Sequence, residues 1–258
     1  MTALNLTTDL APRPLARRLW NVARLHAANP FAILVTPLIV LGIIFLANLV
    51  VWWVIFTVTT GNTEAVGNAS AGLQWSGASM WTFIYMMVVA IQAMNLTFPF
   101  ALGFGSTRRD FSLGTGLTFV ALSAFYALIY TGMAALETAT HGWGLNGAMF
   151  TAAYFGDVTW WVRLFHVFAA FLFFFSIGTV FGAIYVRYRA RGLILFFLVL
   201  TLVLIGLVAL ATLTANWVAV GEFFATLGLT GTYALSLVVS AVAALAGYLV
   251  LQRATPQA

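Results

Sequence analysis

Apolar residues along this chain are gathered into six long runs separated by short polar stretches. The runs lie at about 31–58, 79–102, 112–136, 163–186, 192–215 and 229–251. A bilayer core about 30 Å thick needs about 20 apolar residues in a helix that rises about 1.5 Å per residue. Each run reaches that length. The pattern therefore predicts an all-α polytopic membrane protein, with six transmembrane helices in one domain over residues 31–251.

The N-terminal residues 13–29 show a different, helical periodicity. Four of their residues share one helical stripe: Leu15, Leu19, Val22 and His26. Arg17 and Arg24 fall on another stripe, and Trp20 suits a membrane interface. We therefore predict that residues 1–30 form a cytoplasmic N-terminus whose amphipathic helix lies on the membrane surface.

Three segments connect the runs on the opposite side. Residues 59–78 are rich in Gly, Asn, Ser and Thr, which predicts a flexible loop. Residues 137–162 carry several Trp and Tyr, which favours an interfacial belt or short helices. Residues 216–228 are too apolar for a solvated loop and too short to span, which predicts a short re-entrant outer helix before the last span.

All eleven basic residues are Arg, because the chain has no Lys, and ten of them fall in four short stretches on one side of the predicted membrane. These ten are Arg13, Arg17, Arg18, Arg24, Arg108, Arg109, Arg187, Arg189, Arg191 and Arg253. The opposite side holds Arg163 and the acidic residues Glu64, Glu137, Asp157 and Glu222. Because basic loops stay in the cytoplasm, both termini, including the tail 252–258, are predicted to be cytoplasmic and the chain to lie in the inner (plasma) membrane.

Composition excludes several classes of function. The chain is 63% hydrophobic and 7% charged, against about 45–50% and about 25% in soluble domains. No loop is long enough to read nucleic acid, despite the basic balance. There is no Cys, and the three His lie far apart at 26, 141 and 166, so we expect no metal site and no catalytic residues. Without Lys there is no P-loop, so the chain itself is not expected to hydrolyse ATP.

The most specific segment is the turn between the second and third runs, which reads FGSTRRDFSLGT over residues 104–115. Thr107 followed by Asp110 resembles a helix-capping pair, and Arg108 and Arg109 would project from the first turn of a short cytoplasmic helix. Two interpretations stay open for the Arg pair. It is either a topological anchor or a docking element for a soluble partner.

With this turn, the chain resembles the membrane subunits of type-2 ABC exporters over nearly its whole length. The resemblance also rests on the amphipathic N-terminal helix, the six spans with both ends inside, and the apolar segment 216–228. It implies a coupling helix that docks on a separate ATPase through Thr107, Arg108, Arg109, Asp110 and Phe111. It also implies a connecting helix that contacts the same ATPase, with Arg17, Arg18, Trp20 and Arg24, and an outer gate with Glu222, Phe223 and Phe224.

The resemblance implies partners as well. Two ATPase copies would bind ATP and Mg, whereas this chain would bind no cofactor, and a second permease copy or a related chain would complete the transporter. No formal charge lies deep in a run, which favours an apolar or amphipathic cargo such as a drug, a lipid-like molecule or a hydrophobic peptide. The alternative is a secondary transporter or channel without an ATPase, and the missing deep charges count against ion coupling.

Three amides interrupt the apolar runs: Asn48 in the first, and Gln92 and Asn95 in the second. Gln92 and Asn95 are three residues apart and share one helix face. Amides in lipid-embedded helices usually form hydrogen bonds between helices. The second interpretation is a polar patch on the translocation path.

Overall fold

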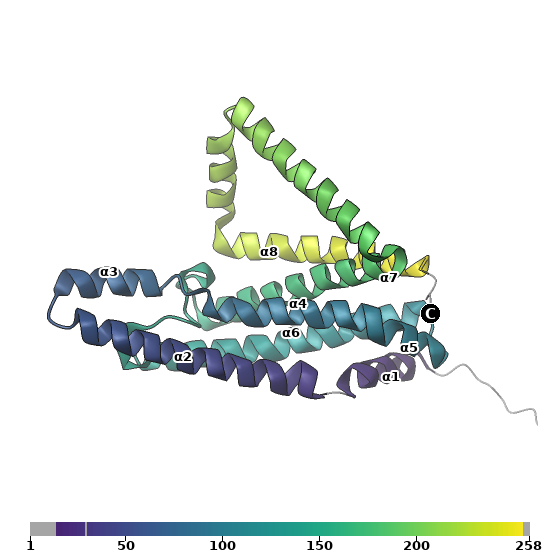
Figure 1. Ribbon diagram of the computed structural model, residues 1–258, viewed down its shortest axis with the longest axis horizontal. Coiled ribbons are helices and arrows are strands. Elements are labelled where there is room, and N and C mark those ends of the chain that lie inside the picture. The colour runs from purple at the N-terminus through teal and green to yellow at the C-terminus, as the bar shows by residue number, and fades with distance from the viewer. Residues whose placement is uncertain (1–13, 29, 255–258) are drawn as a thin grey trace, which may run out of the picture.

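The computed structural model describes residues 14–28 and 30–254, and this part of the chain is mainly helical, without a strand (Figure 1). The α-helices are α1 (Leu15–Ala27), α2 (Thr36–Thr59), α3 (Thr63–Leu73), α4 (Met80–Gln92), α5 (Phe98–Gly103), α6 (Arg108–Ala139), α7 (Trp160–Leu213) and α8 (Trp217–Gln252). Short helical turns fill several connections: η1 (Phe31–Val35), η2 (Gly77–Ser79), η3 (Ala93–Thr97), η4 (Gly142–Asn146) and η5 (Ala153–Phe155).

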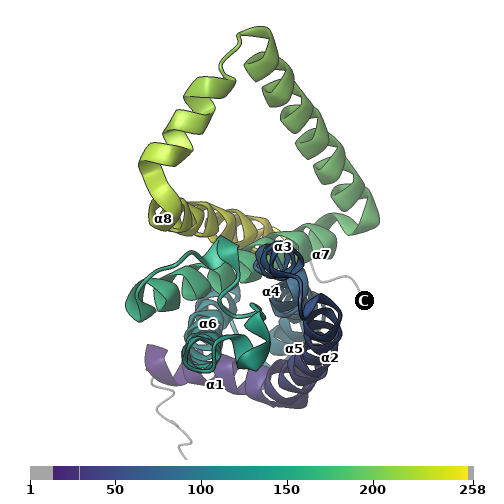
Figure 2. The ribbon, with the colours of Figure 1, turned by 90° about the vertical axis from the view of Figure 1, so that its left-hand side faces the viewer.

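Helices α2, α4 and α6, the first part of α7 and the last part of α8 run side by side as one bundle (Figures 1 and 2). Among the described residues, five continuous helices are long and apolar enough to cross a membrane. The expectation of an all-α polytopic protein agrees with this. The count is five rather than six because the fourth and fifth runs are joined end to end in α7, which consists of two helices that meet at a kink at Arg189.

Helix α7 changes direction at Arg189, whose backbone is not helical (φ 57°, ψ −158°). Residues 190–213 then lean away from the bundle, and residues 217–227 return toward it as a second helical segment (Figure 2). We call residues 190–227 the arm. From 197 to 226 all but one of its residues are exposed. The fifth run therefore does not pack in the bundle of its own chain, which its apolar length alone could not reveal.

The segment 216–228, predicted as a short outer helix, is helical over 217–227 and is separated from the rest of α8 at Gly228 (φ 65°, ψ 177°). A left-handed φ is easily adopted only by glycine, so Gly228 suits this bend. Its depth in a membrane stays a prediction.

Two glycines one turn apart bring α7 into close contact with α4. A Cβ atom on Gly178 would lie 2.3 Å from the carbonyl oxygen of Met87, and one on Gly182 would lie 2.6 Å from Cβ of Met94. Small residues spaced by four let membrane helices approach to backbone distance, where dispersion contacts replace the missing hydrophobic drive. The α4–α7 packing therefore depends on the absence of these two side chains.

We expect Gly178→Ala to destabilise the protein by about 1–3 kcal/mol, because the carbonyl it would strike belongs to a helix backbone that cannot rotate away. Gly132→Ala is the matched control, since no atom lies within 4 Å of a Cβ there and alanine is the better helix former. Thermal melting in detergent, followed by size-exclusion chromatography, compares the two. Equal melting temperatures of the two variants would contradict the prediction, because α4 and α7 could then move apart to admit the methyl group added at Gly178 without a loss of stability.

One π-helical turn lies in each of two junctions: η1 is between α1 and α2, and η3 is between α4 and α5. Pro99 has no N–H to donate, and the preceding η3 turn widens to five-residue hydrogen bonding. At η1, Tyr126 donates its hydroxyl to the carbonyl of Ile33 at 2.6 Å and Tyr85 donates to Ala32 at 2.8 Å. The tyrosines satisfy carbonyls near the start of the first predicted span.

The flexible loop predicted over 59–78 is wrong for its middle part, which folds as α3. Asn62 caps this helix by accepting a hydrogen bond from the backbone N–H of Ala65 at 3.1 Å, and Glu64 lies in the first turn. Both features stabilise a helix N-terminus. The sequence carried this capping signal, but the surrounding Gly, Asn and Ser obscured it.

Candidate functional site at the Arg-rich end of the bundle

The elements that carry the clustered Arg residues meet at one end of the bundle. They are α1, the turn from α5 to α6, the bend in α7 and the end of α8 (Figure 1). Of the ten Arg predicted on one side, nine are described here and Arg13 lies outside the described residues. We call this region the Arg-rich end. The charge asymmetry of the sequence is therefore also an asymmetry in space.

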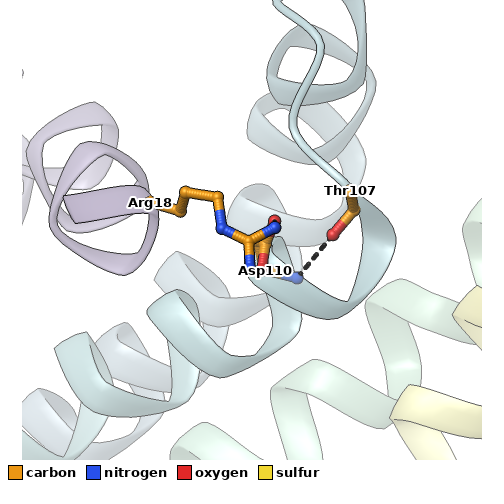
Figure 3. Close-up of polar contacts among 3 residues, drawn as sticks. All are labelled: Arg18, Thr107 and Asp110. Atoms are coloured by element: carbon orange, nitrogen blue, oxygen red, sulfur yellow. Dashed lines mark hydrogen bonds and ion pairs between the residues drawn. The ribbon is translucent and has the colours of Figure 1, made fainter. Parts of the chain in front are cut away.

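Thr107 begins α6 as predicted, because its hydroxyl accepts a hydrogen bond from the backbone N–H of Asp110 at 3.1 Å (Figure 3). The Asp110 carboxylate is buried and accepts from Nη1 of Arg18 on α1, also at 3.1 Å. A buried carboxylate in the first turn of a helix is favoured by the helix dipole and by this cation. The pair fastens α1 to the start of α6.

Two further contacts continue this attachment along both helices. Val22 is fully buried against Gly114, where a Cβ atom would lie 2.7 Å from that of Val22. One turn later, Nε2 of His26 lies 2.8 Å from the hydroxyl of Thr115. We call these three contacts, at Arg18, Val22 and His26, the α1–α6 clasp. They hold the amphipathic helix parallel to the beginning of α6.

The buried face of α1 in the clasp differs from the stripe predicted for the N-terminal helix. Leu15 is 44% exposed, whereas Arg18 joins the buried side through its ion pair. Of the residues assigned to the connecting helix, Arg17, Trp20 and Arg24 are exposed and Arg18 is half-buried. The hydrophobic pattern could not reveal the true stripe, because one of its members is a charged residue with a partner 92 positions away.

Only part of the predicted coupling segment is available for a partner. Phe111 is fully buried, with its ring 5.1 Å from that of Phe98, and Asp110 is buried by its ion pair. These two side chains are buried in the single chain, and the docking role of the five residues from Thr107 to Phe111 stays a prediction. Thr107 and Arg109 are exposed. The segment also forms no separate short helix, since α6 runs unbroken for 32 residues.

Arg108 forms hydrogen bonds within the chain. Its Nη1 donates to the carbonyl of Leu251 at 3.0 Å and to that of Gln252 at 2.5 Å. These carbonyls belong to the last turn of α8, where helices leave acceptors without partners and favour a cation. Arg108 thus caps α8 from the first turn of α6. The two adjacent arginines have different roles that their sequence does not distinguish.

His26 makes the clasp sensitive to acid. Burial lowers the pKa of His26 from its ordinary value of 6.5 to about 4. A buried base whose pKa is lower in the folded chain than in the unfolded chain takes up its proton more easily when the chain unfolds. The folded form therefore keeps its full stability at a pH above the unfolded pKa and loses stability as the pH falls toward the folded pKa. We therefore expect α1 to detach progressively between about pH 6.5 and 4.

Hydrogen exchange of the α1 amides, corrected for the intrinsic pH effect, measures this detachment. His26→Gln is the matched control, because glutamine can still bond Thr115 but does not titrate over this range. We expect the pH dependence of α1 protection to disappear in that variant. Protection that stays constant in the parent down to pH 4 would contradict the prediction.

A cavity of about 440 Å³ lies between α6, α7 and α8. Its walls are mainly apolar, with hydroxyls from all three helices and no charged side chain. The lining residues are Met94, Ser112, Thr115, Gly116, Phe119, Val120, Phe168, Leu172, Ser176, Thr179, Leu237, Ser240, Ala241, Ala244, Tyr248 and Leu251. This cavity was not predicted from the sequence. Its only signal was the spacing of small and hydroxyl residues every three or four positions in three runs.

The three amides predicted on a translocation path do not line this cavity. Asn48 donates to the carbonyl of Ile44 in its own helix at 2.8 Å. Gln92 is exposed, and the side-chain oxygen of Asn95 is buried without a hydrogen-bond partner among the described residues. The structure therefore does not bring them together as one polar patch around the cavity.

The residues predicted for the outer gate lie on the arm. Phe223 and Phe224 are about half exposed, with ring centroids 5.3 Å apart, and Glu222 is exposed. They belong to the segment 217–227, which stands apart from the bundle (Figure 1). Their role as a gate stays a prediction.

The opposite end of the bundle holds a buried carboxylate. Glu137 is 1% exposed and accepts hydrogen bonds from five groups. The donors are the backbone N–H groups of Met149, Phe150 and Thr151, the Thr151 hydroxyl at 2.5 Å and Nε1 of Trp143 at 3.1 Å. The carboxylate thus orders the connection between α6 and α7.

Arg163 completes this arrangement. Arg163 is only 8% exposed and donates to the carbonyls of Phe150 and Gly156 at 3.1 and 2.9 Å. Asp157 is exposed. The buried charges at this end therefore hold the loop backbone in place.

The resemblance of the chain to type-2 ABC exporter subunits rests on its own residues alone. In the comparison with known proteins, no protein-family model, no curated protein and no solved structure matches the chain.

Proposed function

We propose that this chain is the permease subunit of an ATP-binding-cassette transporter that exports an apolar or amphipathic substrate. The observation that carries the proposal is the α1–α6 clasp. It places the exposed side of an amphipathic helix beside the exposed Thr107 and Arg109 at the Arg-rich end. A helix and a turn fixed side by side offer one preorganised surface to a soluble partner, which lowers the entropy cost of binding.

The partner in this proposal is a separate ATPase, in two copies, that binds ATP and Mg. This chain has no Lys and hence no P-loop, so another polypeptide has to supply hydrolysis. Arg17, Arg24 and Arg109 are exposed cations on the proposed docking surface. They would meet an acidic groove on the ATPase. On this proposal the chain lies in the inner membrane, with the Arg-rich end and both termini on the cytoplasmic side.

A second permease copy, or a related chain, is part of the same proposal. The arm exposes long apolar helices on all sides and leaves its own bundle, so it is the part of the chain free to contact another membrane subunit. In such a pair, Phe223 and Phe224 would close the exit path against the second subunit. Glu222 would then remain at the water boundary, because an unpaired charge is costly in lipid.

The alternative of an ion-coupled secondary transporter finds less support. Glu137 and Arg163 are the buried charges at the outer end, and both are occupied by backbone groups. No charged residue lines the cavity between α6, α7 and α8. A carrier that moves protons or ions needs titratable or coordinating groups along its path.

Purification of the tagged chain from its native membranes tests the proposal. We expect a P-loop ATPase and ATP hydrolysis to co-purify with the chain in mild detergent, and reconstituted vesicles to move apolar dyes only when ATP is on the Arg-rich side. An unrelated six-span protein with the same tag is the control. Dye movement by the purified chain without ATP, driven by an ion gradient, would contradict the proposal and favour the secondary transporter.

A further inference from the structure

We propose that the cavity between α6, α7 and α8 binds an uncharged, largely apolar molecule that carries a hydrogen-bond donor. The inference names a substrate class for the proposed exporter and rests on that function for its physiological meaning. The binding itself is a property of this chain alone. The volume of the cavity, about 440 Å³, falls in the range of about 300–1,000 Å³ that holds drug-sized ligands.

The shape of the cavity favours an elongated molecule. On α8 its lining runs from Leu237 to Leu251, about 21 Å at a rise of about 1.5 Å per residue, and on α7 from Phe168 to Thr179. At the Arg-rich end, Ser112 and Leu251 line the cavity, and Arg108 joins their two helices by its hydrogen bond to Leu251. The walls are therefore tied together at this end.

The polar groups of the cavity favour a donor on the ligand. The hydroxyls of Ser176, Thr179 and Ser240 each donate to a carbonyl of their own helix, at 2.8, 2.9 and 2.7 Å. Their oxygens can still accept. Ser112 also lines the cavity, and its buried hydroxyl has no hydrogen-bond partner in the described part of the chain. A buried polar group without a partner costs free energy, and a rotation of the Ser112 side chain toward the cavity would let a ligand hydroxyl or amide recover it.

The absence of charge from the lining excludes an ionised ligand. An ion moved into an apolar site without a partner is strongly disfavoured, so a carboxylate or ammonium would remain outside. Thr115 belongs both to the cavity wall and to the α1–α6 clasp, through His26. A ligand in the cavity would thus lie one side chain from the helix that we propose to contact the ATPase.

Photolabelling of the purified full-length chain in nanodiscs, without any ATPase, tests the inference. The probe is an aliphatic alcohol with a diazirine in its chain, and mass spectrometry locates the adducts. We expect adducts on the cavity-lining segments of α6, α7 and α8. They should fall at least fivefold in Ala244→Phe, which fills the cavity, and stay unchanged in Val242→Phe, whose side chain is 63% exposed on the same helix.

Two companion probes define the ligand class. The matching diazirine carboxylate should label the cavity at least fivefold less than the alcohol. In the variant Ser112→Ala, labelling by the alcohol should fall about two- to tenfold, as expected for the loss of one hydrogen bond. Labelling that is equal in both phenylalanine variants, or as strong with the carboxylate, would overturn the inference. Its outcome is independent of the proposed function, which fails instead if no ATPase co-purifies.

A phospholipid with a diazirine at the end of one acyl chain distinguishes two sources of this chemistry. If the alcohol labels the cavity and the phospholipid does not, the site takes a free molecule. If the phospholipid also labels it and Ala244→Phe abolishes that labelling, the apolar molecule comes from the bilayer. Both results support an apolar ligand site. If Ala244→Phe changes neither probe, no such site exists.

Discussion

Glu137→Gln is expected to give the largest loss of stability of any single polar substitution considered for this chain. The carboxylate accepts hydrogen bonds from three backbone N–H groups, one hydroxyl and one indole, all converging on two oxygens. Glutamine has one acceptor oxygen, and its NH₂ group cannot accept the hydrogen bonds that the second carboxylate oxygen accepts. At least two buried donors would lose their partner, at about 1–3 kcal/mol each.

The expected decrease in melting temperature is about 5–15 °C, since 1 kcal/mol corresponds to about 2–4 °C in a chain of this size. Glu64→Gln is the matched control, because Glu64 is exposed in the first turn of α3 and its loss should change stability by about 0.5 kcal/mol or less. Thr151→Val removes a single donor from Glu137 and should fall between the two. A Glu137→Gln protein that melts within about 2 °C of the parent would show that the connection holds its shape without the carboxylate.

Features encoded within a few residues could be predicted from the sequence. The apolar runs became long helices because an uninterrupted run of about 20 apolar residues satisfies its backbone within one helix. Thr107 began α6 because an N-cap needs only its own next turn. The amphipathic N-terminal helix also formed, although the residues that attach it differ from those predicted.

Features that depend on distant partners could not be predicted. Glu137 looked like a surface residue because the N–H groups that it binds lie 12 to 14 positions later in an irregular loop. Arg108 and Arg109 looked alike, and only the end of α8, more than 140 positions away, separates them. The direction of the arm depends on one non-helical residue, Arg189, inside an otherwise helical sequence. None of these leaves a periodic signal.

Arg109→Glu is expected to reduce the recovery of a co-purifying ATPase at least tenfold while leaving the stability of the chain within about 0.5 kcal/mol of the parent. Arg109 is exposed beside the α1–α6 clasp, so reversing its charge mainly repels a complementary partner surface. A tenfold loss corresponds to about 1.4 kcal/mol of binding free energy. Arg191→Glu is the matched control, because Arg191 is also exposed, at the bend of α7, and changes the net charge equally.

Arg108→Gln separates docking from folding. We expect it to lower stability by about 1 kcal/mol, because the carbonyls of Leu251 and Gln252 lose a charged donor, while each folded molecule still binds the ATPase. A double reversal of Arg108 and Arg109 would mix the two effects, so the single variants have to be compared. Melting curves report the first effect and ATPase recovered per folded chain reports the second. If Arg109→Glu and Arg191→Glu recover equal amounts of ATPase, Arg109 is a topological anchor and is not part of a docking surface.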